Sequence, residues 1–399
     1  MPADNRKGIV AMIREASFSA IYMGLLAAFV GYSASFAIVL AGLSAMGATD
    51  AQVATGLFFA TLGMGLCSIW LPAVSRIPAA VAWSTPGAAF LASASVLPGG
   101  FAEAVGAMIL CAALILATGF VPVLGRLVAA IPKPVANALL AGVLLRLCFA
   151  PAQALGTAPA LILPLLLAWA AGLAWHRLAA MPLTILAFLA VTFFAVEAPA
   201  SAMAASDTGL PALVPLMPVF SLQGFVSVAL PLYLVTMAGQ NIPGFAVLEL
   251  NGYAVERQPL IRRTGLASLL IAPFGAIPVN MSAITAAMMS GEDAGREPSR
   301  RYWAAIASGL AYVAMALFAE PIVALASIAP SELITAVAGL ALIPALVSSL
   351  SGAFSVPGRL EAPALTFLFA ASGMTLFGVS GAFWGTLAGV LVWLLKRPS

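Results

Sequence analysis

The stretches Ala82-Trp83-Ser84-Thr85-Pro86-Gly87 and Gly275-Ala276-Ile277-Pro278-Val279-Asn280 each interrupt an apolar segment with helix-breaking residues. Each predicts a short extended stretch followed by a half-length helix. Non-helical backbone at membrane depth is tolerated only where protein or a water-filled cavity covers it. If the chain crosses a membrane, both stretches should therefore face the interior of the protein.

The composition indicates a membrane protein. The chain is 63% hydrophobic and 8% charged, with a mean hydropathy of +1.09. Apolar runs of ~20 residues can span a lipid bilayer, and a soluble core could not hide this much apolar surface. The longest polar stretches, Asn251–Arg263 and Gly291–Tyr302, are too short for a soluble domain. We expect the lipid bilayer as a partner, and the net charge of +3 gives no reason to expect nucleic acid.

The apolar segments predict an all-α polytopic protein with fourteen transmembrane segments. The clear spans cover residues 18–46, 51–73, 101–123, 134–150, 158–176, 182–199, 224–247, 302–323, 331–351, 362–378 and 380–395. Three shorter pieces, 79–97, 264–274 and 275–290, complete the count. The run from Phe18 to Met46 is too long for a signal peptide, so it is the first span and residues 1–17 are cytoplasmic.

The distribution of basic residues supports this count. With the amino terminus inside, sixteen of the 17 Lys and Arg residues fall on the cytoplasmic side, as the positive-inside rule requires. They are Arg6, Lys7, Arg14, Arg76, Arg126, Lys133, Arg177, Arg257, Arg262, Arg263, Arg296, Arg300, Arg301, Arg359, Lys396 and Arg397. The exception is Arg146, in the outer half of span 5. If span 3 were not a span, the loops after it would change sides of the membrane, and Arg126 and Lys133 would lie outside.

Fourteen spans divide into two halves of seven spans each. Because seven is odd, the second half starts on the opposite side of the membrane and is inverted relative to the first. The boundary would lie in Pro199–Gly224, the longest loop without Lys or Arg. Ala54-Thr55-Gly56-Leu57 opens span 2 and Arg263-Thr264-Gly265-Leu266 opens span 9, each followed by a broken span, 3 or 10. Inverted repeats with paired discontinuous helices are typical of secondary transporters.

The two breaks can form an anion site. A helix amino terminus presents free N–H groups and about half a positive charge, so two such ends meeting at mid-membrane need no Lys or Arg. In span 3 we expect the helix to start at Pro86 with Ser84 or Thr85 as its cap. In span 10 we expect Asn280 as the cap, with Met281 and Ser282 donating N–H groups. The alternative is that Pro86 and Pro278 only kink structural helices.

Span 8 carries a second polar feature, Met237-Ala238-Gly239-Gln240-Asn241-Ile242-Pro243-Gly244. Adjacent amides deep in an apolar helix are costly unless partnered, so Gln240 and Asn241 either bind substrate or bond to neighbouring helices. The counterpart in span 1 is Gly31-Tyr32-Ser33-Ala34-Ser35-Phe36. The aromatic side chains that could line a pocket are Tyr32, Phe36, Trp83, Phe90 and Phe245.

Charged residues within spans are few. Glu103 or Glu320 could pair with Arg146 or extend to the interface, and His176 at the end of span 6 fits an interfacial role. No carboxylate lies in the middle of span 8 or 10, so the proton site is not located.

The three cysteines, in apolar segments, form no disulfide or metal pattern, and we expect no cofactor. Walker loops, metal-ligand clusters and Gly-x-Ser-x-Gly are absent, which argues against an enzyme.

Three motifs carry a family resemblance. Ser84-Thr85-Pro86-Gly87-Ala88-Ala89, Leu230-Pro231-Leu232 with Gln240-Asn241-Ile242-Pro243-Gly244, and Asn280-Met281-Ser282-Ala283-Ile284-Thr285 resemble the benzoate/proton symporter (BenE-type) family. The resemblance covers essentially the whole chain. That family is similar in fold to uracil/xanthine and sulfate permeases.

The resemblance implies a core domain of residues 18–123 and 224–323 (spans 1–4 and 8–11). It also implies a gate domain of residues 124–223 and 324–395, a cytoplasmic end at 396–399 and a homodimer formed by gate domains. Nucleobase permeases carry acids in spans 8 and 10, where this chain has Gln240 and Asn241 and no acid before Glu292.

The resulting hypothesis is a proton-coupled symporter of benzoate or a similar aromatic carboxylate in a bacterial inner membrane, working by an elevator mechanism. Alternatives are a symporter of a nucleobase or another organic anion, and an anion channel or uniporter. The expected substrate-binding residues are Tyr32, Ser33, Ser84, Thr85, Pro86, Gly87, Ala88, Gln240, Asn241, Asn280, Met281 and Ser282.

Overall fold

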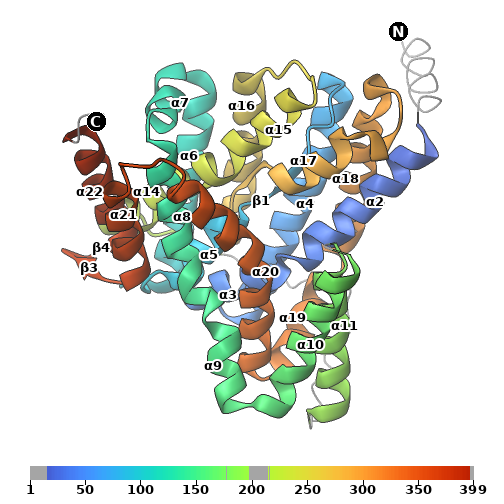
Figure 1. The fold of residues 1–399 in the computed structure, drawn as a ribbon, viewed down its shortest axis with the longest axis horizontal. Coiled ribbons are helices and arrows are strands. Elements are labelled where there is room, and N and C mark those ends of the chain that lie inside the picture. Colours follow the sequence, from blue (N-terminus) through green and yellow to red (C-terminus); the bar gives the residue numbers. More distant parts are fainter. Residues whose placement is uncertain (1–15, 177, 197–213, 215, 396–399) are drawn as a thin grey trace.

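A computed structural model of the chain describes residues 16–176, 178–196, 214 and 216–395. It is a helical membrane protein (Figure 1). Within these residues, six helices are long and apolar enough to cross a membrane. A seventh candidate is the pair Pro298–Ala316 and Ala319–Ile328, bent by 58°.

The fourteen predicted crossings exceed the six or seven found by helix length, because several apolar segments are short or interrupted. Pro159–Trp175, Ala180–Ala195 and Gly381–Leu395 are apolar helices of fewer than 18 residues. Fourteen crossings therefore stay a prediction. The segments before Ala16 and after Leu395, both predicted to be cytoplasmic, and most of the predicted boundary between halves lie outside the described residues.

The first half of the chain is helical apart from one short strand. Its elements are α2 (Phe18–Ser33), α3 (Phe36–Ala45), α4 (Asp50–Ser75), β1 (Val81–Trp83), α5 (Thr85–Ser93), α6 (Gly100–Phe120), α7 (Pro122–Ala129), α8 (Lys133–Cys148), α9 (Ala150–Thr157), α10 (Pro159–Trp175) and α11 (Ala180–Ala195). The single run predicted from Phe18 to Met46 is divided at Ala34 and Ser35, where the Ser35 hydroxyl donates to the Gly31 carbonyl at 2.8 Å. The division falls inside the polar motif noted in span 1.

The second half begins with a long helix that contains two π-helical turns. Its elements are α13 (Leu222–Gly224), η1 (Phe225–Ala229), α14 (Leu230–Thr236), η2 (Met237–Asn241), α15 (Ile242–Leu250), α16 (Arg257–Ile271), η3 (Ala272–Phe274), β2 (Val279–Met281), α17 (Ala283–Ser290), η4 (Glu292–Ala294), η5 (Pro298–Arg300), α18 (Tyr302–Ala316), α19 (Ala319–Ile328), α20 (Ser331–Ala353), α21 (Glu361–Ser372), β3 (Thr375–Leu376), β4 (Val379–Ser380) and α22 (Gly381–Leu395). Pro231 and Pro243, which have no backbone N–H, are the second residues of α14 and α15, directly after η1 and η2. π-Helical turns are frequent at functional sites.

The helices pack in two groups. In the first group, α18 packs against α2 and α4, and α16 packs against α6. In the second group, α8 packs against α20 and α21, and α21 packs against α22. Contacts of α3 with α20 and of α5 with α8 connect the groups. In Figure 1, α21 and α22 lie on the left and α2 and α18 on the right.

Small residues allow close backbone approach between α4 and α18. A Cβ atom added at Gly309 would lie 2.7 Å from the Gly65 oxygen and 2.8 Å from the Ile69 nitrogen. Membrane helices associate through such contacts because lipid is as apolar as the side chains and offers no hydrophobic drive. The pair Gly65 and Gly309 therefore fixes the distance between these two helices.

We expect Gly309→Ala to lower the free energy of unfolding by about 1–3 kcal/mol, the usual cost of overpacking, because backbone atoms leave no room for the methyl group. The matched control is Gly156→Ala in α9, where nothing lies within 4 Å of the added Cβ. Unfolding of both purified variants in detergent measures the difference. Equal stability of the two variants would contradict this packing argument.

Candidate functional site

The two broken segments meet in the middle of the fold as an antiparallel pair of strands. β1 pairs with β2 in the register Val81↔Met281, Ala82↔Asn280 and Trp83↔Val279. Two further bonds extend the ladder, from Ser84 N to Pro278 O at 2.8 Å and from Ser282 N to Ala80 O at 2.9 Å. Each interrupted segment therefore satisfies part of the other's backbone.

Two buried serines complete the hydrogen bonding at the free edges of this pair. The Ser68 hydroxyl on α4 bonds to the Val81 carbonyl and N–H at 3.1 and 3.2 Å. The Ser268 hydroxyl on α16 bonds to the Val279 carbonyl and N–H at 3.0 and 3.0 Å. Sequence reasoning missed both residues, although a serine in the apolar helix before each break was the available signal.

The helix in span 3 begins one residue earlier than predicted. α5 starts at Thr85, and Ser84, one of the two expected caps, is its N-cap. The Ser84 hydroxyl accepts from Gly87 N–H at 3.1 Å and bonds to the Thr236 hydroxyl at 2.7 Å. Pro86 lies in the first turn of α5, where a backbone N–H would have no acceptor within the helix, so its missing N–H costs no hydrogen bond.

The predicted cap of the helix in span 10 is wrong. α17 starts at Ala283 and its N-cap is Ser282, whose hydroxyl accepts from Thr285 N–H at 3.4 Å. Asn280 instead lies within β2, where its side-chain N–H donates to the Met281 carbonyl at 3.0 Å and its side-chain oxygen accepts from Ser84 N–H at 3.2 Å. The strand extends through Met281 because its ladder with β1 continues to Ser282. Asn280 is therefore too early in the chain to cap the helix.

This register also removes two donors that the sequence suggested for an anion. Met281 N–H donates to the Asn241 side-chain oxygen at 3.0 Å, and Ser282 N–H donates to Ala80 O. The first-turn N–H groups of Ala283 and Ile284 have no intrahelical acceptor. The Ile284 side chain is 62% exposed, whereas Ser282 and Thr285 on either side are buried.

The polar turn of span 8 lies against both helix starts. Gly239 in η2 faces Pro86, because an added Cβ would be 3.5 Å from the Pro86 ring. Gly244 in α15 faces Met281, with an added Cβ 2.9 Å from the Met281 Cβ. The glycines therefore let one helix contact the beginnings of α5 and α17 together.

The two amides of this turn have different surroundings. Asn241 is fully buried, accepts from Met281 N–H and donates to the Met237 sulfur at 3.2 Å. Gln240 is also buried, but its side chain has no hydrogen-bond partner among the described residues. Asn241 therefore fits the structural alternative, and Gln240 is left with free bonding capacity.

Some of the expected aromatic side chains come together. Tyr32 stacks on Phe36 with ring centroids 6.1 Å apart and meets Trp83 at 5.0 Å. The Trp83 indole N–H donates to the Ser35 hydroxyl at 2.8 Å. Among the described residues, Phe90 and Phe245 take no part in these ring contacts, since Phe90 lies near the other end of α5 and Phe245 in α15.

Two buried hydroxyls nearby lack partners within the described part of the chain. They belong to Tyr32 at the end of α2 and to Thr285 in the first turn of α17. Gly31 is adjacent to both, because a Cβ there would lie 3.0 Å from the Thr285 methyl group. Ser33, also predicted for the site, is buried in the last turn of α2. Unpaired buried hydroxyls are rare, and one role of such a group is to bind a ligand.

The suggested ion pairs with Arg146 are not formed. Glu103 accepts from Gly99 N–H at 2.7 Å and from the Ser221 hydroxyl, while Arg146 donates to the Ser93 carbonyl. His176 is exposed at the end of α10, where its Nδ1 accepts from Leu178 N–H, in keeping with an interfacial position. Among the described residues, Glu320 keeps one buried oxygen unpaired.

The pattern that defines the benzoate membrane transport protein (BenE) family matches residues 14–395. The chain belongs to this family. Inner membrane protein YdcO of Escherichia coli is 36% identical over 368 residues, which cover 92% of this chain and 93% of that protein. A benzoate membrane transport protein of Acinetobacter baylyi is 31% identical over 384 residues, 96% of each chain. The protein is therefore a membrane transporter rather than an enzyme.

Solved structures agree on the fold. The transmembrane domain of the cyanobacterial bicarbonate transporter BicA superposes with a TM-score of 0.61 at 15% identity, covering 95% of this chain and 98% of that one. SLC26A9 superposes with a TM-score of 0.64 at 12% identity, covering 97% of this chain and 67% of that one. At these identities the likeness concerns the fold alone.

We expect Ser268→Ala to cost about 1–3 kcal/mol of stability, because the buried N–H and carbonyl of Val279 would lose their partner. Ser308→Ala is the matched control, since that serine is equally buried but, within the described part of the chain, bonds only to Ala305 O in its own helix. Thermal unfolding in detergent compares them. If both variants melt together, Ser268 does not support the strand pair.

Proposed function

We propose that the protein takes up benzoate or a similar aromatic carboxylate together with a proton, by an elevator-type mechanism in a bacterial inner membrane. The observation that carries the proposal is that the starts of α5 and α17 both lie against the polar turn of span 8. The family and the name of the Acinetobacter relative support the substrate class.

The carboxylate would lie between the first turns of α5 and α17. Both ends carry a partial positive charge, and the first-turn N–H groups of Ala283 and Ile284 have no helical acceptor. The Gln240 amide and the Thr285 hydroxyl, which lack partners among the described residues, could complete the bonding. The ring would lie on Tyr32 and Trp83. No acid is required, which favours a carboxylate over a nucleobase.

An inverted repeat is supported by paired local features. Ser68 and Ser268 bond in the same way to the first residues of β1 and β2, and Ser84 and Ser282 cap the helices that follow. Packing repeats as well, since α4 contacts α18 and α16 contacts α6. These correspondences relate span 2 to span 9 and span 4 to span 11, the pairing that seven plus seven spans require.

The division into core and gate follows the two groups of helices. α2–α6 and α13–α18 would form the core that carries the substrate, and α8–α11 with α20–α22 the gate, through which a homodimer would form. α5, which would belong to the core, contacts α8, which would belong to the gate. Movement of the core along the gate would carry the helix starts from one side of the membrane to the other.

An interfacial position of the basic loops is supported by their aromatic partners. Arginines at the predicted inner face lie over rings: Arg76 over Tyr302 at 4.9 Å, Arg263 over Trp70 at 5.3 Å and Arg359 over Trp393 at 4.9 Å. Aromatic residues concentrate at membrane interfaces. In the same region the hydrogen-bonded Glu249 carboxylate raises the pKa of Arg257, which stays charged.

We expect proteoliposomes holding the purified protein to accumulate radiolabelled benzoate when an inward proton gradient is imposed. Because an anion and a proton enter together without net charge, a potential set with valinomycin and potassium should leave the initial rate unchanged within about twofold. Uptake to equilibrium without accumulation would indicate a channel or uniporter. Competition by uracil would instead support a nucleobase symporter.

We expect Gln240→Ala to raise the KM for uptake by about tenfold or more, the loss of one hydrogen bond to a charged group. Asn280→Ala should weaken uptake too, through the strand pair that positions both helix starts. Gln153→Ala, at an exposed position in α9, is the control. Wild-type transport by both Gln240→Ala and Asn280→Ala would refute the site.

A further inference from the structure

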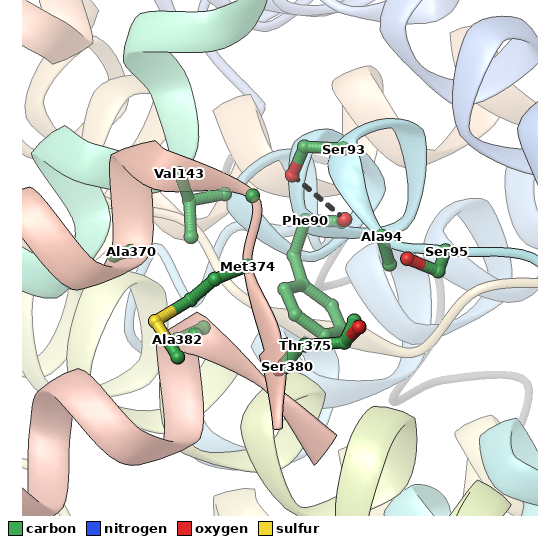
Figure 2. A pocket seen from close by; sticks show the side chains of 12 residues that line it. Phe90, Ser93, Ala94, Ser95, Val143, Ala370, Met374, Thr375, Ser380 and Ala382 are labelled. Atoms are coloured by element: carbon green, nitrogen blue, oxygen red, sulfur yellow. Dashed lines mark hydrogen bonds between the residues drawn. The ribbon is translucent and has the colours of Figure 1, made fainter. Parts of the chain in front are cut away.

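The cavity beside the end of α5 is too small for a ligand larger than water. It lies between Phe90 and the β3–β4 hairpin, which carries Thr375 and Ser380 (Figure 2), and its volume is about 20 Å³. That volume holds about one water molecule. The outer face of α4 and α16, in contrast, is open and carries charge that the protein itself does not pair.

The helices α4 and α16 lie side by side and antiparallel. Arg263 of α16 lies over Trp70 of α4 at 5.3 Å, and farther along the pair a Cβ added at Gly63 would lie 2.9 Å from Cδ1 of Ile271. Residues four apart on a helix share a face. The exposed side chains at this seam form one surface, which we name the α4–α16 strip: Leu66 and Trp70 from α4, and Arg262, Leu266 and Leu270 from α16.

Two guanidinium groups lie at one end of the α4–α16 strip. Arg262 lies over the Phe120 ring at 5.3 Å, and the neighbouring Arg263 over the Trp70 ring. Both rings are exposed. Stacking on a ring uses the face of a guanidinium and leaves the N–H groups at its edge available for an anion such as phosphate. Neither arginine has a hydrogen bond or an ion pair among the described residues.

Acidic side chains do not neutralise this charge. α16 contains no Asp or Glu, and the acids of α4 and α6, Asp50 and Glu103, lie in the first turns of those helices, at the ends away from the two arginines. Glu249 is bonded to Arg257 at 2.7 Å. Glu256 lies before the helix begins. The end of the strip is therefore electropositive and open to an external anion.

The rest of the α4–α16 strip is apolar. Leu270 lies two turns beyond Arg262, about 12 Å along the axis, and Leu66 and Leu266 lie between these levels. One leaflet of a bilayer has a hydrocarbon layer of about 15 Å. A pair of arginines above an apolar surface of this length matches the phosphate and one acyl chain of a single phospholipid.

We propose that the α4–α16 strip binds an anionic phospholipid, with its phosphate on Arg262 and Arg263 and an acyl chain along Leu266 and Leu270. The aromatic rings of Trp70 and Phe120 hold the two guanidinium groups at the level of the headgroup, where aromatic residues concentrate in membrane proteins. The site is independent of the transported substrate and of the side of the membrane that the basic loops face.

Lipid binding to the purified protein tests the proposal without any transport. Native mass spectrometry of the delipidated protein in a neutral detergent compares phosphatidylglycerol with phosphatidylcholine of the same acyl chains. The wild-type protein should bind phosphatidylglycerol more tightly. Arg262→Gln combined with Arg263→Gln should weaken that binding about 20-fold and leave phosphatidylcholine within about twofold, because each basic side chain near a membrane surface contributes roughly a factor of five. An unchanged affinity for phosphatidylglycerol would overturn the proposal.

Arg359→Gln is the matched control for a single charge. Its guanidinium also lies over an aromatic ring, Trp393 at 4.9 Å, but no second arginine is next to it in the chain. Arg262→Gln alone should weaken phosphatidylglycerol binding about fivefold, and Arg359→Gln less than about twofold. An equal loss in the two variants would mean that the lipid responds to overall charge, and would reject a site on the α4–α16 strip.

Two measurements on the wild-type protein decide the matter if the double variant does not fold. Salt at about 0.5 M should weaken binding of phosphatidylglycerol but not of phosphatidylcholine, because exposed charges are screened. Millimolar inorganic phosphate should not displace phosphatidylglycerol, because free phosphate has no acyl chain to contact the apolar part of the strip. Binding that ignores salt, or displacement by inorganic phosphate, would contradict a phospholipid held by the arginines and the apolar side chains together.

Discussion

Backbone polar groups that leave a helix inside a membrane must find partners within the protein, and this requirement organises the middle of the fold. β1 and β2 satisfy the hydrogen-bonding groups on each other's inner edges, and the Ser68 and Ser268 hydroxyls satisfy those on the outer edges. Because the ladder is antiparallel, the helices that follow start at its two opposite ends, and both starts lie against span 8. The position of the candidate site is thus a consequence of hydrogen-bond satisfaction.

The same arrangement explains how an anion could be held without a cation. The capping serines accept hydrogen bonds from one N–H at each helix start. Asn241 bonds β2 to span 8, while the neighbouring Gln240 stays unpaired among the described residues. One amide supports the structure and the other can serve a ligand. Both amides lie in the π-helical turn, which also holds Gly239 against Pro86.

The sequence was sufficient for the membrane class, the two breaks and the family, because hydropathy, proline and glycine act locally. It misplaced the cap of α17, since the length of β2 depends on its partner strand rather than on Asn280 itself. The bonds of Ser68 and Ser268 were beyond it, because a lone buried serine commonly bonds to its own helix, as Ser308 does. Arg146 stood out in the charge pattern, but its bond to Ser93 replaced the ion pairs that were considered.

The pairing of β1 with β2 has a consequence for how the protein is made. The ladder between β1 and β2 cannot form until Met281 has been synthesised, roughly two hundred residues after Val81. Until then the first broken segment has no lasting partner for part of its backbone, so it should stay at the translocon or in water rather than in lipid. Insertion of the first half is therefore incomplete until the second half arrives, and neither half is expected to be stable alone.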